Sequence, residues 1–419
     1  MKRITLLLAI FFLLSFFVFS ADFGLLLDQR LEAENGLSGN RLITYTPALA
    51  PWFSWDGGEG VSVYLSGLFS YRYYNYNGDL SGNDWTFVPE LSRLVKDGGI
   101  FIPEISRFAI NYRINEGMTL EAGRVAYDDA LGFVASGLFD GVILETEAPL
   151  GTITAGIFYT GLLYKETGKI IMTDYDAKKY SEEWDYDFST GYFTSRRALA
   201  AVRWDMPVGE SNSLSAELLA QFDLNGEDEK LNSQYLEVLY EFYPEISPMF
   251  SMMRVSVGAL VETMQNNDGD FGAAFGFLAK VKTDLPTSIS DWLGLTVKFT
   301  SGASGDIFNS FIPLSSVSQG MIFANTNAGL ALVSADYSLM ITESLFAECS
   351  FSYYIRTYDD PYIDGRLYGG EVWASLGWQP LEDIRATLGG GVFFPGMGNI
   401  YPDNSDAMWK ITAGVTLSF

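Results

Sequence analysis

The sequence predicts an all-β fold, an antiparallel transmembrane β-barrel of about 18 strands (16–18) that follows an N-terminal signal peptide. Three observations lead to this fold class. Apolar and polar residues alternate with period two from about residue 60 to the end of the chain. Most of the expected strands are close in length to the 9–11 residues that a tilted strand needs to cross a bilayer. The connections between strands are alternately long and short, as in bacterial outer-membrane barrels.

The first 20 residues have the features of a secretory signal peptide. Lys2 and Arg3 form a basic head, residues 4–17 are almost all Leu, Ile and Phe, and Val18-Phe19-Ser20 resembles a cleavage site. We therefore expect residues 1–20 to be removed and residues 21–419 to form the barrel. The residue directly after the site is Ala21 and not Cys, so lipid anchoring at a new N-terminus is not expected.

Composition excludes several classes of protein. The chain is 48% hydrophobic and 15% aromatic, which is too apolar for disorder. Its net charge of −26 argues against nucleic acid as a partner. The single Cys349 cannot form an intrachain disulfide, and its position in the alternation places it on the apolar face.

The sequence contains no His. Hydrolases that depend on a Ser-His or Cys-His pair, and metal sites built on His, are therefore excluded. We expect no catalytic residue, no resident metal and no cofactor.

The last strand gives the clearest alternation. Trp409, Ile411 and Val415 share one face with the terminal Phe419, and Lys410 lies on the other face. This ending resembles the C-terminal signature of bacterial outer-membrane barrels, which the outer-membrane assembly machinery recognises. The resemblance implies that Trp409 and Phe419 act as an assembly signal.

The same alternation places the strands along the whole chain. We expect them at about 22–32, 40–48, 60–74, 101–113, 118–127, 138–147, 152–163, 194–205, 212–223, 233–243, 251–264, 270–283, 291–302, 325–338, 342–356, 367–379, 382–394 and 408–419.

The connections support this order of strands. If the C-terminus lies in the periplasm, all but one of the predicted periplasmic turns are short, and the long connections at 75–100, 164–193, 303–324 and 395–407 are extracellular. Only the connection at about 49–59 is long for a periplasmic turn. An even number of strands follows.

A local repeat complicates the count of strands. Residues 87–93 (FVPELSR) nearly recur at 101–107 (FIPEISR), with Lys96-Asp97-Gly98-Gly99 between them as a good hairpin turn. We expect the two copies to form the arms of an extracellular hairpin that extends a barrel strand. The alternative is a strand pair missing from the count.

Charged residues within the strands fall on the face opposite the apolar stripe, so we expect them to line the lumen. A charge on the lipid face costs roughly 2–4 kcal/mol near the midplane for Lys or Arg. Eleven are basic and six are acidic, and the acidic ones concentrate on the strands around 212–264. The predicted pore-lining residues are Arg107, Arg113, Arg197, Arg203, Arg254, Lys280, Lys282, Lys298, Arg356, Arg385, Lys410, Glu217, Glu237, Glu241, Glu262, Glu348 and Glu371.

These charges admit two interpretations. Opposed acidic and basic walls are typical of a solute-conducting pore, whereas a closed interior would hold the same residues in salt bridges. A barrel of about 18 strands is too wide for side chains alone to fill, which favours the pore. Because salt screens charges beyond about 8 Å, we expect the wall to outweigh distant loops and to give weak selectivity for anions.

One further segment suggests a family. Gly123-Arg124, Tyr127-Asp128-Asp129 and Gly137-Leu138-Phe139-Asp140-Gly141-Val142 resemble a stretch of alginate-export-type and related porins. In those porins a strand ends in Gly-Arg and the next opens with Phe-Asp-Gly-Val. The resemblance implies an outer-membrane location and anionic or sugar-like solutes. The general pattern is also similar to that of uncharacterised spirochaete outer-membrane proteins.

Two functional hypotheses follow. The first is a porin-like channel for small hydrophilic solutes, which has outer-membrane lipid and the assembly machinery as partners and is a monomer or a homotrimer. The second is a surface-exposed binding barrel, an adhesin or receptor, that acts through the aromatic-rich connections 75–100 and 164–193.

The terminal signature gives a first test. We predict that Phe419→Ala, or deletion of the last three residues, lowers outer-membrane assembly more than it lowers synthesis. Heat-modifiable electrophoretic mobility of membrane fractions measures assembly, and total immunoblots measure synthesis. Normal amounts of inserted, heat-modifiable protein in either variant would contradict the prediction.

Overall fold

The computed structural model describes residues 21–37, 39–77, 99–226, 230–244, 252–287, 289–303, 309–360, 363–402 and 405–419. The expected signal peptide at residues 1–20 lies outside this part of the chain. So do most of the connection at 75–100 and the first copy of the repeat at 87–93.

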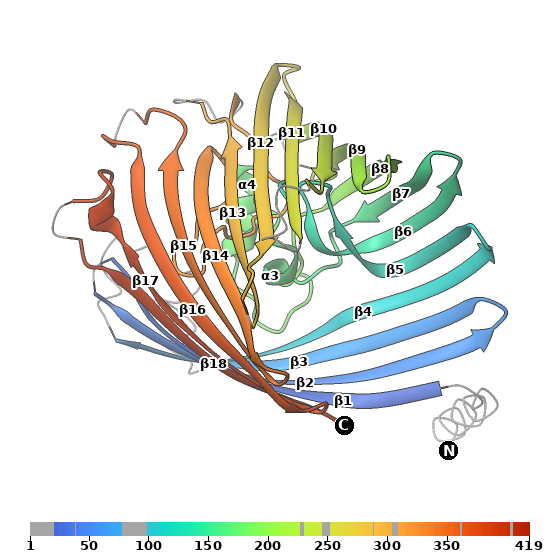
Figure 1. The fold of residues 1–419 in the computed structure, drawn as a ribbon, viewed down its shortest axis with the longest axis horizontal. Coiled ribbons are helices and arrows are strands. Elements are labelled where there is room, and N and C mark those ends of the chain that lie inside the picture. Colours follow the sequence, from blue (N-terminus) through green and yellow to red (C-terminus); the bar gives the residue numbers. More distant parts are fainter. Residues whose placement is uncertain are drawn as a thin grey trace.

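The described residues form 18 antiparallel strands in one closed sheet (Figure 1). The prediction of about 18 strands is confirmed, because each expected range overlaps a strand in the same order. The strands are β1 (Ala21–Asn35), β2 (Arg41–Gly58), β3 (Val61–Asn77), β4 (Ile100–Asn115), β5 (Met118–Asp128), β6 (Ser136–Ala148), β7 (Gly151–Tyr159), β8 (Arg197–Val208), β9 (Asn212–Asp223), β10 (Leu231–Phe242), β11 (Met253–Asn266), β12 (Phe271–Asp284), β13 (Ser290–Thr300), β14 (Leu330–Thr342), β15 (Leu345–Arg356), β16 (Leu367–Leu381), β17 (Ile384–Phe394) and β18 (Met408–Ser418).

The first and last strands close the barrel. Their pairing runs from Leu26 opposite Ser418 to Glu34 opposite Lys410. Beyond it, the backbone N–H of Phe419 donates to the carbonyl of Leu25 at 2.9 Å, and the N–H of Leu25 donates back at 3.0 Å. Closure pairs both terminal strands, so neither is an outer edge strand of the sheet.

One end of the barrel carries mostly short turns and the longest loops lie at the other end, as the sequence predicted, although the connection at 243–252 on the short-turn end has ten residues. The sequence predicted one long connection at the short-turn end, at about 49–59, and this prediction is wrong. Residues 49–58 are not a connection, because β2 continues to Gly58 and turns through residues 59–60 into β3. Leu49 and Phe53 share one face of the strand and Trp52 lies on the other, so the period of two continues through this segment.

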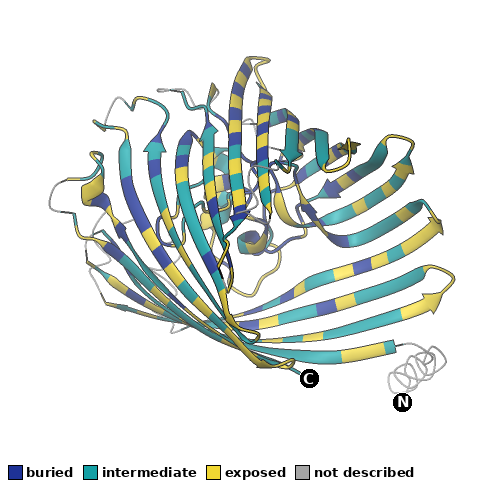
Figure 2. Cartoon of the chain, viewed as in Figure 1, coloured by how far each residue is buried: buried dark blue, intermediate teal, exposed yellow. Residues whose placement is uncertain are grey.

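The outer wall is apolar and exposed, and the inner wall is polar or covered. On β12, Phe271 and Phe275 are 74% and 56% exposed, whereas Ala274 and Leu278 on the other face are buried. Figure 2 shows this alternation along β11 and β12. An exposed apolar belt around a closed sheet matches a bilayer and not water, so the barrel is of the membrane-spanning type.

Three loops at the long-loop end fold back into the barrel. L3 (residues 129–135), L4 (160–196) and L7 (301–329, of which 304–308 are not described) pack on the inner wall of β5–β12. Phe133 of L3, Leu163 of L4 and Phe311 of L7 belong to one buried cluster with Tyr235 of β10. These loops bury the inner wall on that side and narrow the lumen.

L4 carries α3 (Lys165–Gly168) and α4 (Asp174–Ser181), which lie inside the ring of strands (Figure 1). A capping box between Thr173 and Asp176 starts α4. A short 3-10 helix, η2 (Pro395–Met397), precedes the last strand. Among the residues that the structure describes, no helix is both long and apolar enough to cross a membrane.

The wall departs from a regular barrel between β4 and β5. Pairing between β4 and β5 ends at Phe108 opposite Arg124. The other edges of the two strands stay paired beyond this point. β4 pairs with β3 as far as Ile100, and β5 pairs with β6 as far as Asp128. The halves of β4 and β5 nearer the long loops therefore diverge, and α3 lies between them in Figure 1. We call this opening the seam.

Candidate functional site

The candidate site is the part of the lumen where the three loops meet. The N–H of Ser315 in L7 donates to the carbonyl of Val134 in L3 at 3.0 Å. The N–H of Ser316 donates to the carbonyl of Lys169 in L4 at 2.9 Å. The loops are thus bonded to one another, and together they constrict the barrel.

Two of the predicted pore-lining acids hold L3 in place. The carboxylate of Glu217 accepts from the N–H of Ala130 at 2.7 Å, and that of Glu237 accepts from the N–H of Leu131 at 3.1 Å. Both side chains are buried. They face inward, as the alternation indicated, but they lie beneath a loop and not on an open lumen.

Two further acids hold L7. Glu262 accepts from the N–H of Ile312 at 3.0 Å. Glu371 accepts from the backbone N–H groups of residues 321–323 at 2.8, 3.1 and 2.8 Å. Hydrogen bonds to a charged acceptor contribute about 1.5–3 kcal/mol each, so this carboxylate is a strong anchor.

Two predicted basic residues are anchors as well. Arg197 is completely buried and forms an ion pair with Asp176 of α4 at 2.5 Å. Arg356 pairs with Asp360 at 3.2 Å and donates to the carbonyl of Gly365 at 2.6 Å. Both side chains point inward, as the alternation indicated. They are buried, however, and bind loops instead of lining the open lumen.

Four basic side chains remain together on the inner wall of β11, β12 and β13. Arg254 lies opposite Lys282, and Lys280 lies on the same face beside β13, which carries Lys298. Within the described residues, Lys280, Lys282 and Lys298 form no ion pair. We call these four residues the basic track.

The upper end of the track borders the constriction. The ammonium of Lys298 lies 5.5 Å from the ring centroid of Phe133 in L3 and donates to Gln319 of L7 at 3.0 Å. It lines a cavity of about 310 Å³ between these loops. Lower on the track, the ammonium of Lys282 lies 4.7 Å from the ring of Trp292.

Several other predicted residues form ion pairs across neighbouring strands. These pairs are Arg107 with Glu121 at 3.2 Å, Arg203 with Glu217 at 3.6 Å, Arg254 with Glu241 at 2.5 Å, and Lys410 with Glu32 and Glu34 at 3.4 and 3.3 Å. Arg113 and Arg385 face inward and are exposed, and Glu348 faces inward and is partly buried.

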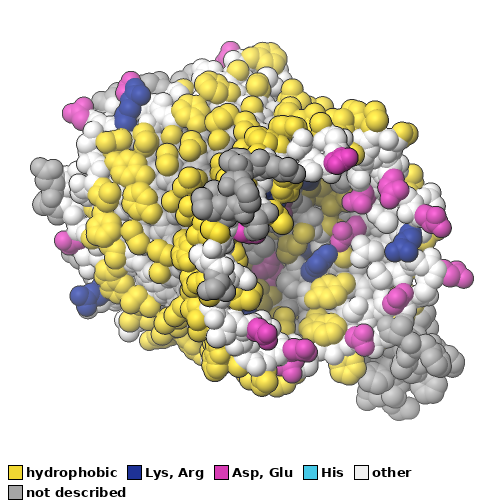
Figure 3. Space-filling model, in the orientation of Figure 1, with side chains coloured by type: hydrophobic (Ala, Val, Ile, Leu, Met, Phe, Trp, Pro, Cys, Tyr) yellow, Lys and Arg dark blue, Asp and Glu magenta, His cyan; other side chains and the backbone are white. Residues whose placement is uncertain are grey.

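The opposed acidic wall expected on strands around 212–264 is not exposed to the lumen, because loops cover most of it. Exposed inward acids lie instead at Glu145 and Glu147 of β6, which were absent from the prediction. Their alternation with Leu144 and Thr146 was a usable signal. Figure 3, in the orientation of Figure 1, shows a hollow near the centre of the molecule, with acidic and basic side chains in and around it.

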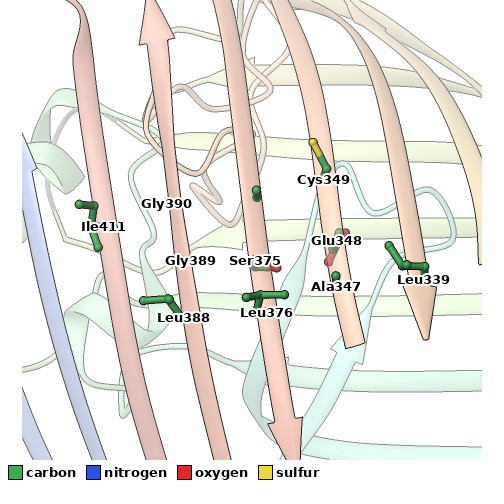
Figure 4. A pocket seen from close by; sticks show the side chains of 11 residues that line it. Leu339, Ala347, Glu348, Cys349, Ser375, Leu376, Leu388, Gly389, Gly390 and Ile411 are labelled. Atoms are coloured by element: carbon green, nitrogen blue, oxygen red, sulfur yellow. The ribbon is translucent and has the colours of Figure 1, made fainter. Parts of the chain in front are cut away.

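Cys349 lies on the outer wall, as the alternation predicted, and away from the lumen. It borders a groove of about 560 Å³ over β14–β18 together with Ala347, Leu388, Gly390 and Ile411 (Figure 4). These side chains belong to the membrane-facing surface, so the groove is not part of the solute path.

Comparison with known proteins identifies the fold. No family model matches the sequence, and no curated protein matches it. Solved structures do match. OccK2 (OpdF) of Pseudomonas aeruginosa in complex with glucuronate has a TM-score of 0.61 at 13% identity, with 95% of this chain and 98% of that chain covered.

Two further solved structures, also from Pseudomonas aeruginosa, match over similar lengths. OccK7 (OpdD) has a TM-score of 0.59 at 14% identity and the same coverage. The outer membrane protein OpdK has a TM-score of 0.57 at 13% identity, with 95% and 99% covered. The fold is therefore that of an outer-membrane porin, which confirms the porin-like fold expected from the sequence. The nearer likeness to alginate-export-type porins stays a prediction.

The anchoring of L7 can be tested. We predict that Glu371→Ala releases the 321–323 segment and increases single-channel conductance or its fluctuations. Loss of one hydrogen bond to a charged group should increase the population of the detached loop about tenfold or more. Planar-bilayer recording measures the effect.

Glu348→Ala is the matched control, because it removes the same charge from the neighbouring inner wall. It should leave conductance close to that of the unaltered protein. Equal conductance and equal noise in both variants would show that Glu371 does not hold the loop.

Proposed function

We propose that the protein is an outer-membrane channel, and not an enzyme, for small hydrophilic solutes that carry a carboxylate or another anionic group. The observation that supports this most is the basic track. Lysine side chains that face the lumen without a carboxylate partner are available to a passing anion. The remainder of the fold supplies a membrane-spanning wall and a constriction that brings the solute close to the track.

The burial of the anchoring residues strengthens the proposal. Removing Arg197 and Arg356 from the predicted set leaves nine of eleven basic residues (11 − 2 = 9). Removing Glu217, Glu237 and Glu262 with Glu371 leaves two of six acidic ones (6 − 4 = 2). With the exposed Glu145 and Glu147 the inward acids number four (2 + 2 = 4), still fewer than the basic residues. Because screening limits these fields to about 8 Å, the residues beside the constriction should dominate selectivity.

The likeness to solved porins agrees with this solute class. One of the matched structures is described as a complex with glucuronate, a sugar that carries a carboxylate. For the present chain, a carboxylate at the level of Lys298 would lie beside the cavity between L3 and L7. Sugar-like hydroxyls would find hydrogen-bonding partners there in Ser318 and Gln319.

The alternative of a surface-binding barrel receives less support from the described residues. It rested on aromatic side chains in the connections 75–100 and 164–193. Trp184 and Tyr192 of L4 are buried against Ile102 of the barrel wall and are not free anchors for a ligand. The described residues therefore favour the channel over the binding barrel.

The basic track gives a measurable prediction. Under a salt gradient across a planar bilayer, we expect the reversal potential to indicate weak preference for anions. Lys280→Gln combined with Lys298→Gln should shift it toward cations, because two positive charges without an ion pair leave the inner wall.

Lys178→Gln, combined with Lys230→Gln, serves as the control, since it removes equal charge from L4 and from the connection between β9 and β10. Strong cation preference of the unaltered protein, or equal shifts in both double variants, would refute the role of the track. Silence where a control porin conducts would refute the channel itself.

A further inference from the structure

The seam leaves backbone groups of β4 without strand partners. From Phe101 to Ile105, the edge of β4 that faces β5 has no ladder. In a membrane-facing wall such groups must be satisfied within the protein, because lipid offers no hydrogen bonds. Side chains provide the partners here, and Pro103 removes one donor from the edge.

Three side chains seal this edge. Arg124 donates to the carbonyl of Ile105, Tyr192 of L4 donates to the carbonyl of Pro103, and the N–H of Phe101 donates to the hydroxyl of Tyr186 at 3.3 Å. Arg124 and Tyr192 belong to different segments, so β5 and L4 close the seam jointly.

The motif that suggested a porin family takes part in the seal. Arg124 and Asp140, from its Gly-Arg and Phe-Asp parts, form a bidentate pair at 2.8 and 3.0 Å. Arg124 also donates to the carbonyl of Leu162 in L4 at 3.0 Å. Register places both charged residues on the outward face, where pairing and the cover of L4 offset their exposure to lipid.

Beside the seam, the outer wall contains a cavity of about 620 Å³. Ligand pockets usually measure about 300–1,000 Å³, so it is large enough for one. Leu65, Phe69 and Ile105 form its wall on the outward faces of β3 and β4. Phe188 and Phe193 of L4 line it from the other side.

The chemistry of the cavity selects its occupant. Its lining is mainly aromatic and aliphatic, and it contains two charged residues, Glu104 and Arg124. Glu104 accepts from the hydroxyl of Thr167 at 3.0 Å. The guanidinium of Arg124 is committed to Asp140 and to backbone carbonyls. A phosphate head group would therefore find no uncommitted cation in this lining. Hydrocarbon is the apolar species that surrounds the outward face of a membrane barrel, and an apolar cavity facing it favours a chain over water.

We propose that this cavity binds one acyl chain of a lipid in the leaflet on the long-loop side, and that the chain completes the seal of the seam. The aromatic side chains of L4 hold it in place. Ring centroids of Phe188 and Tyr192 are 4.8 Å apart, and those of Tyr192 and Phe193 are 4.9 Å apart, so they form a continuous lining. This site is on the outer wall and is separate from the solute path.

Photocrosslinking tests the proposal on the full-length protein. Phe188→p-benzoylphenylalanine places the probe at the cavity, and Leu236→p-benzoylphenylalanine places it on the plain outer wall of β10, where the native side chain is similarly exposed (49% and 53%). The protein is reconstituted with palmitoyl-oleoyl phosphatidylethanolamine and phosphatidylglycerol, exchanged into detergent, and then irradiated. Mass spectrometry identifies adducts.

We expect a phospholipid adduct at position 188 and none at position 236, because only a chain held in the cavity survives the exchange. Equal lipid adducts at both positions, no adduct at 188, or a detergent adduct alone at 188 would each overturn the proposal.

A cavity-filling variant gives the second test. Gly67 lines the cavity and has no left-handed φ, so Gly67→Leu can place a side chain there. The adduct at 188 should fall about tenfold or more, because leucine takes the space of the chain. Gly390→Leu on the outer wall of β17 is the matched control and should leave it unchanged.

Heat-modifiable mobility verifies that each variant is folded. Leu162→Trp fills the same cavity from L4 and replaces Gly67→Leu if that variant does not assemble. An undiminished adduct in a folded cavity-filled variant would overturn the assignment. Conductance is not part of this test, so the lipid site and the proposed channel stand or fall separately.

Discussion

The structure depends on one constraint: backbone hydrogen-bonding groups that face lipid must be satisfied by the protein itself. Closure of β1 on β18 satisfies it for the terminal strands, through a pairing that ends with Phe419 bonded to Leu25. At the seam the constraint is met differently, because side chains replace a missing strand. The cost of leaving such groups unpaired explains why L4 is bonded to this part of the wall.

A related constraint, the need of buried backbone groups for hydrogen-bonding partners, separates two kinds of inward charge. Loops that enter the barrel bring backbone N–H groups into a region with little water, and those groups need acceptors. Glu217, Glu237, Glu262 and Glu371 accept from them, and each therefore serves the loops. Inward charges that do not anchor loops are available to a solute. Among the described residues, the basic track is a contiguous group of such charges.

Inner and outer surfaces thus have distinct chemistry on one set of strands. The period of two places a lumen residue beside every lipid-facing residue, so a single strand such as β12 carries Lys280 and Lys282 inside and Phe275 and Phe277 outside. The outer surface can then acquire features of its own, such as the groove at Cys349 and the cavity at the seam, without altering the lumen.

The sequence by itself determined the barrel, the number and order of its strands and the inward direction of the charged residues, because a period of two follows directly from strand geometry. It could not separate anchors from pore-lining residues. Glu371 and Glu348 have the same alternation, and only the path of L7 makes one of them an acceptor. Nor could it show that β4 and β5 part at Arg124, since pairing depends on the neighbouring strand. Contacts between residues distant in the chain decided the constriction and the seam, and period alone carries no information about them.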